Sequence, residues 1–120
     1  MEKKNKILTQ SKAFAIHIIR AYQYLSDEKH EYVLSKQLLR SGTSIGANVR
    51  ESINAQSKLD FINKLNIALK ESNETEYCLE LLHETGYLDN TAYESIIEDN
   101  NNITGTLVNI IKSTKQNINN

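Results

Sequence analysis

The sequence lacks the residues that mark frequent turns. Its 120 residues include no proline, and its four glycines lie at positions 42, 46, 86 and 105. β-Sandwiches and barrels need turn signals about every 8–12 residues. The scarcity of proline and glycine therefore favours helices joined by short turns. The lone cysteine, Cys78, excludes a disulfide framework or a cysteine metal site within one chain.

Long apolar runs and an excess of one charge are also missing. No stretch approaches the roughly 20 apolar residues that cross a bilayer, and the basic start is followed by polar residues 9–12, unlike a signal peptide. We therefore expect a cytoplasmic protein without a membrane segment. The formal net charge of −1 gives no global basic field. The length, with 39% hydrophobic and 24% charged residues, fits one domain over residues 1–120.

Apolar and small residues recur at alternating steps of four and three residues, which is the spacing of a helix face. The first such stripe consists of Ile7, Ser11, Phe14, Ile18, Ala21 and Leu25. Three more stripes follow, and together they predict helices over about 5–26, 30–56, 58–85 and 91–116. Connections this short force antiparallel neighbours, so we predict an all-α, antiparallel up-down-up-down four-helix bundle.

Helix boundaries carry local signals. Ser57 followed by Asp60, and Thr91 followed by Glu94, resemble capping boxes at the starts of the third and fourth helices. Gly86 is placed to end the third helix in a left-handed conformation. Gly42 and Gly46 each cost roughly 1 kcal/mol inside a helix. We nevertheless expect the second helix to continue through both glycines, because its stripe keeps its phase across them.

Two short motifs suggest enzymes, but their contexts argue against that reading. Residues 42–46 match the G-x-S-x-G pattern around a hydrolase nucleophile, which would be Ser44. That serine normally follows a β-strand, and none is expected here. Glu80 and His83 have the spacing of one di-iron ligand pair, yet no good second copy exists. We therefore predict no catalytic residue, no metal, no cofactor and no small-molecule substrate.

Carboxylates on the third helix divide into two groups. Glu76, Glu80 and Glu84 are spaced four apart, which is typical of a solvated face. Glu71 and Glu74 are placed to meet Arg40 or Arg50 from the second helix.

Charge also divides between the two ends of the predicted bundle. One end collects Lys3, Lys4, Lys6, Lys12, Lys58, Lys64, Lys112 and Lys115, and the other end is acidic. The lysines either bind phosphates or merely solubilise the chain ends.

Several segments together resemble the 23S rRNA intervening-sequence protein family, also called four helix bundle proteins. They are QLLRS at 37–41, SIGAN at 44–48 followed by Glu51, FINKL at 61–65 and ALKESNETE at 68–76. The resemblance covers about residues 10–110. It implies a cytosolic ring-shaped homopentamer without known catalytic activity, related in fold to the accessory variability determinant of diversity-generating retroelements. That relative works with a reverse transcriptase and nucleic acid.

The resemblance also assigns signature positions. They are Arg40, Ser44, Asn48, Glu51, Glu71, Glu74 and Glu76, which we interpret as a polar network between helices or subunits. Off-stripe apolar residues support assembly, because a monomer would expose them. These are Ile19, Tyr22, Tyr24, Leu39, Ile53, Ile62, Leu69, Ile97 and Ile111.

Two functions remain open at this point. The first is a non-enzymatic, self-assembling scaffold whose partners are copies of itself. The second is an accessory protein that binds RNA or DNA, or a nucleic-acid-processing protein, through the basic end of its ring.

Overall fold

The computed structural model describes residues 2–119, with side chains from Lys6 to Asn117. This part of the chain folds into four α-helices and no strand, which confirms the all-α prediction. The helices are α1 (Glu2–Asp27), α2 (Leu34–Ile53), α3 (Lys58–Glu84) and α4 (Asn90–Asn119).

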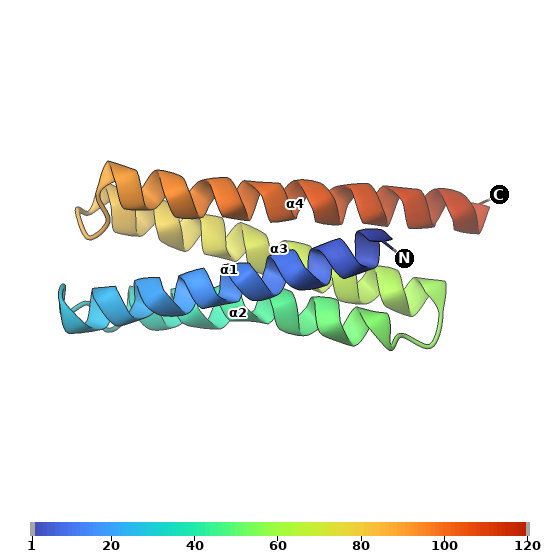
Figure 1. Cartoon of the computed structure of the whole chain (residues 1–120), viewed down its shortest axis with the longest axis horizontal. Helices are drawn as coiled ribbons and strands as arrows, with labels where there is room; N and C mark the ends of the chain where they lie inside the picture. The colour runs from blue at the N-terminus through green and yellow to red at the C-terminus, as the bar shows by residue number, and fades with distance from the viewer. Residues whose placement is uncertain (1, 120) are drawn as a thin grey trace.

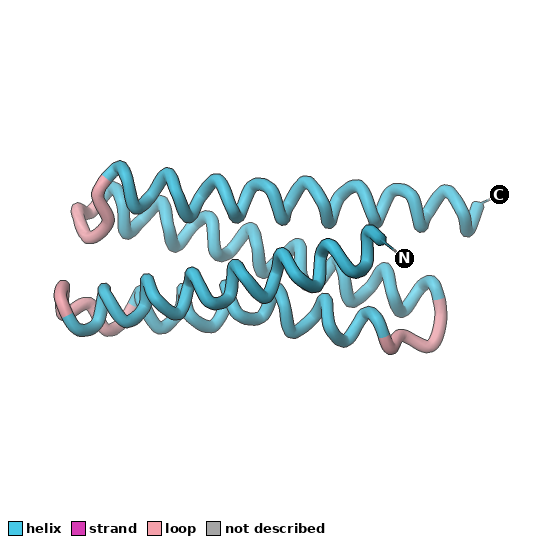
Figure 2. Tube along the Cα trace, viewed as in Figure 1, coloured by secondary structure: helices cyan, strands magenta, loops and turns pink. Residues whose placement is uncertain are grey.

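The four helices lie side by side in a body of 51 × 21 × 20 Å. Successive helices reverse direction, so the α1–α2 and α3–α4 turns share one end, while the α2–α3 turn shares the other with the start of α1 and the end of α4 (Figures 1 and 2). Each helix packs against two others, and the backbones of the diagonal pairs α1/α3 and α2/α4 do not approach each other closely. The outward faces of α1 and α3 therefore lie on opposite sides of the molecule.

The predicted stripes form one continuous core. All six positions of the first stripe are buried, including Phe14, Ile18 and Leu25. They pack with buried residues from the other three helices, among them Leu65 and Leu107.

Small polar residues interrupt this core between α2, α3 and α4. The Thr75 hydroxyl donates to Ser41 Oγ at 2.9 Å, and Asn100 Nδ2 donates to the Ser72 carbonyl at 3.1 Å. Ser72 Oγ also lies 3.2 Å from Thr104 Oγ1. These hydrogen bonds pair most of the polar side chains between α2, α3 and α4, but Asn100 Oδ1 is buried without a partner.

Helix α2 continues through both glycines, as the phase of its stripe predicted. A Cβ atom on Gly42 would lie 2.8 Å from both Cγ atoms of Ile18. The glycine thus lets α1 and α2 approach closely. At Gly46 the added atom would lie 3.4 Å from the Ser11 carbonyl oxygen.

The predicted start of α2 was wrong by four residues. The helix begins at Leu34, because the Glu31 side chain folds over its end and accepts hydrogen bonds from the backbone N–H groups of Val33, Leu34 and Ser35. His30, just before, has a φ of 56°. The chain therefore turns sharply where a helix had been expected.

The other helix boundaries follow the prediction more closely. Ser57 Oγ accepts a bond from the Asp60 N–H at 3.0 Å, and α3 ends before Gly86, which has a φ of 88°. At α4 the expected Thr91–Glu94 box was wrong. Asp89 Oδ1 instead accepts a bond from the Ala92 N–H at 2.8 Å, so α4 begins one residue earlier.

The off-stripe apolar residues divide into three groups. Ile62 and Ile111 are buried in the core, which corrects the expectation that a monomer would expose them. Four are half-buried, namely Tyr22, Leu39, Leu69 and Ile97, and three are exposed, namely Ile19, Tyr24 and Ile53. The structure adds exposed Ile16, Ile67 and Tyr77 to this last group.

No stretch among the described helices combines the length and the apolar character that crossing a membrane requires.

Candidate functional site

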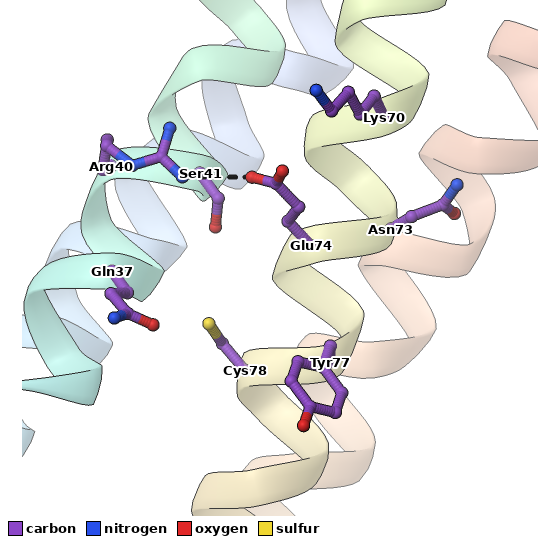
Figure 3. Close-up of a pocket in the computed structure, with 8 residues that line it drawn as sticks. All are labelled: Gln37, Arg40, Ser41, Lys70, Asn73, Glu74, Tyr77 and Cys78. Carbon is purple, nitrogen blue, oxygen red and sulfur yellow. Dashed lines mark hydrogen bonds and ion pairs between the residues drawn. The ribbon is translucent and has the colours of Figure 1, made fainter.

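The signature residues converge mainly on the outer seam between α2 and α3. Arg40 reaches across from α2, with Nη2 3.0 Å from Glu74 Oε2 (Figure 3). Its Nη1 atom lies 3.4 Å from Glu71 Oε2. The hydrogen bond with Glu74 and the charge of Glu71 raise the pKa of Arg40. The Arg40 side chain is 61% exposed and that of Glu71 is only 13% exposed. The arginine thus neutralises a largely covered carboxylate at the surface.

Ser44 and Asn48 continue this seam along α2, but their polar groups bond to their own helix. Ser44 Oγ donates to the Arg40 carbonyl at 2.6 Å, and Asn48 Nδ2 donates to the Ser44 carbonyl at 2.9 Å. The hydroxyl of Ser44 and the amide NH₂ group of Asn48 are therefore both partnered within α2.

Glu51 closes the seam near the α2–α3 turn. Its Oε2 atom lies 3.7 Å from Lys64 Nζ on α3. Lys64, which the sequence grouped with possible nucleic-acid ligands, is therefore engaged in an ion pair between helices.

Glu76 does not join the seam. It faces α4, where burial raises the pKa of Tyr93 and the charges of Glu80, Glu76 and Glu84 raise it further. The reason is angular, since two residues turn a helix by about 200° and so separate Glu76 from Glu74.

A hollow of about 620 Å³ opens beside Arg40. Figure 3 shows its lining residues, which are Gln37, Arg40 and Ser41 from α2 and Lys70, Asn73, Glu74, Tyr77 and Cys78 from α3. On the sequence alone, Cys78 served only to exclude a disulfide framework and a cysteine metal site, and its position beside this hollow was missed. Its spacing of four residues from Glu74 was the available signal.

The thiol of Cys78 is influenced by two charged side chains, Glu74 and Arg40. Burial raises the pKa of its thiol, the Glu74 carboxylate raises it further, and Arg40 opposes both effects. A thiolate is therefore disfavoured, and a nucleophilic role is poorly supported.

The motifs that suggested enzymes have other surroundings. Ser44 lies within a helix and bonds to a backbone carbonyl, so it does not have the strained turn of a hydrolase nucleophile. His83 stacks on Tyr93 at 4.2 Å between ring centroids and bonds Asn90 Oδ1 at 2.6 Å. Among the described residues, no group of three or more His, Cys, Asp or Glu side chains is arranged to hold a metal ion.

Five of the other lysines that the sequence grouped as possible nucleic-acid ligands lie at one end of the bundle. Lys6, Lys12, Lys58, Lys112 and Lys115 are all exposed and belong to the helix segments at the end with the α2–α3 turn (Figure 1). The side chains of Lys3 and Lys4 lie outside the part that the structure describes.

Comparisons with known proteins agree with this architecture. Residues 3–109 match the model of the 23S rRNA-intervening sequence protein family. A solved structure from Bacteroides thetaiotaomicron, described as a protein of unknown function from the S23 ribosomal protein family, is 56% identical to this chain with a TM-score of 0.91. The similarity covers 92% of this chain and 98% of that one. No curated protein matched this chain. The chain therefore belongs to the 23S rRNA-intervening sequence protein family.

Proposed function

We propose that this protein is a non-enzymatic, cytoplasmic scaffold, an antiparallel four-helix bundle that assembles with copies of itself. One observation carries the proposal. Large apolar side chains project from the outward faces of two diagonal helices, with Ile16 and Ile19 of α1 45% and 40% exposed, and Ile67 and Tyr77 of α3 42% and 61% exposed. Exposed apolar patches commonly mark surfaces that bind other proteins.

The placement of these patches favours a ring. A two-fold dimer uses one patch against itself, whereas two different patches on opposite sides fit a head-to-tail contact that closes into a ring. The family resemblance implies five subunits. The Arg40–Glu71–Glu74 cluster beside Tyr77 would then hold the α2–α3 seam in a fixed shape at this contact.

The molecular mass in solution tests the proposal. We expect light scattering to give a multiple of the 13.7 kDa chain mass, five-fold for the pentamer. The I16Q/I19Q variant should keep its helical circular dichroism but give the mass of one chain, because glutamine removes the apolar contact at similar helix propensity.

Val33 provides a matched control. It is 68% exposed but lies in the α1–α2 turn, away from both faces, so V33Q should assemble like the wild type. A monomeric wild-type protein, or full assembly of I16Q/I19Q, would contradict the proposal.

The second candidate is RNA or DNA binding, with or without a nucleic-acid-processing partner. Five exposed lysines at one end favour it, and a ring would place the equivalent ends of all subunits on one face. We expect a mixed RNA pool to bind with steep salt dependence, and K112E/K115E to weaken binding. Binding that ignores salt and this variant would exclude the basic end as the site.

A further inference from the structure

The described charges separate along the long axis of the molecule. The end with the α2–α3 turn carries the five exposed lysines together with Arg50 and Lys64. The carboxylates described there are Glu51 and Asp60, and both have partners. Glu51 pairs with Lys64 at 3.7 Å, and Asp60 Oδ2 accepts a bond from the Gln56 N–H at 3.3 Å. This end therefore has a clear excess of positive charge.

The opposite end, formed by the α1–α2 and α3–α4 turns, has the reverse charge. Its exposed carboxylates are Asp27, Glu28, Glu84, Asp89, Glu94 and Glu98. The exposed cations described near these turns are Arg20, which lines a hollow together with Asp89, and Lys29 and Lys36. The Lys29 ammonium lies 6.0 Å from the centre of the Tyr24 ring. These six exposed carboxylates outnumber the three cations, so this end is negative.

The shape of the molecule keeps the two charged ends independent. The bundle is 51 Å long, whereas the Debye length at physiological ionic strength is about 8 Å. An approaching molecule therefore meets one charged end with the other screened, although the net charge is only −1.

We propose that the acidic end of one copy docks onto the basic end of another, so that copies associate end to end along the bundle axis. The partner is a second copy, because the two surfaces of opposite charge belong to the same chain. Side-by-side assembly would strengthen this contact, since a ring places all acidic ends on one face and all basic ends on the other. A single chain already carries both surfaces, so the contact does not depend on ring formation.

Charge reversal at each end tests the proposal. K58E/K112E removes most of the positive charge of the basic end, and E28K/E84K removes most of the negative charge of the acidic end. The new charges at positions 58 and 84 are those favoured by the helix dipole at the start and end of α3, which supports folding. Sedimentation velocity on nuclease-treated protein at ionic strengths of about 0.01 M and about 1 M compares Debye lengths of about 30 Å and 3 Å.

We expect wild-type protein to gain at least a doubling of mass at low salt, and neither variant to do so alone. An equimolar mixture of the two variants should regain the association, because each variant keeps the charged end that the other lacks, whereas the protein carrying all four changes should not associate. The N101E/N102E control, which adds negative charge at the exposed middle of α4, should still associate.

Three results would overturn the proposal. They are equal wild-type mass at both salts, low-salt association that survives in either variant alone, and association that disappears with nuclease treatment. The last would assign the basic end to nucleic acid. Side-by-side assembly through apolar faces should persist at about 1 M salt, because salt screens charges and not apolar contacts. The mass at high salt therefore reports the side-by-side assembly, and the gain in mass at low salt reports the end-to-end contact.

Discussion

Gly42 illustrates how one missing side chain determines a helix contact. An alanine Cβ would meet Ile18 at 2.8 Å, and Ile18 is fully buried and β-branched, so it has little freedom to move. Overpacking costs about 1–3 kcal/mol, and the better helix propensity of alanine returns about 1 kcal/mol. We expect G42A to lower the free energy of unfolding by about 1 kcal/mol in urea titrations.

Gly105 supplies the matched control. Nothing lies within 4 Å of a Cβ built there, in the middle of α4. G105A should raise the free energy of unfolding by about 0.5–1 kcal/mol, because alanine loses less backbone entropy on folding. Equal effects of G42A and G105A would show that the Ile18 contact is unimportant.

Asn100 places an unpaired polar atom in the core, which lowers the stability of the fold. It is 1% exposed, and its Oδ1 atom has no partner. N100L removes this oxygen with a side chain of the same branching, so thermal denaturation should show a more stable protein, by about 1 kcal/mol. N100A leaves a cavity instead and should be less stable than N100L. A destabilised N100L would instead indicate that the bond to Ser72 outweighs the unpaired oxygen.

Cys78 gives a pH-dependent prediction. Its pKa is raised on folding, first by burial and then by Glu74. The folded protein therefore keeps a proton that the unfolded chain loses above the ordinary value of 9.0, so this stabilisation is complete below that pH and declines above it. The stability difference between wild type and C78A should shrink as urea titrations move from neutral to alkaline pH. A constant difference would exclude this coupling.

At the scale of elements, α2 depends on a carboxylate outside the helix. Glu31 is 9% exposed and accepts three backbone N–H bonds, the shortest 2.6 Å from Ser35. E31A would leave these donors unpaired, so we expect a loss of about 1–3 kcal/mol in the free energy of unfolding. The neighbouring exposed Glu28 is the control, and E28A should change stability little. Equal stability of E31A and E28A would contradict the capping role.

The elements also show what the sequence can predict. Alternating steps of three and four residues located all four helices and most of the core, because burial requires that spacing. The start of α2 was missed since glutamate is an uncommon cap and Glu31 acts from three residues before the helix. Spacing likewise places Arg40 within reach of Glu71 and Glu74. It does not show which neighbouring helix Glu76 faces, nor that Cys78 borders a hollow, because both depend on how neighbouring helices pack.

For the whole molecule, assembly links stability to concentration. Subunit contacts that exist only in the folded state raise the melting temperature as protein concentration rises. We expect this dependence in wild-type protein and its loss in I16Q/I19Q, as measured by circular dichroism over a hundred-fold range of concentration. A melting temperature independent of concentration in both proteins would indicate that the apolar faces do not hold copies together.

The start of α1 and the end of α4 lie at the same end as the α2–α3 turn (Figure 1). Anything fused to either terminus therefore emerges beside the exposed lysines and leaves the acidic end uncovered. The same arrangement suits circular permutation, in which a short linker joins the two termini and new ends open in the α1–α2 or α3–α4 turn. Such a permutant would move its fusion points to the acidic end while the core and both charged surfaces keep their residues.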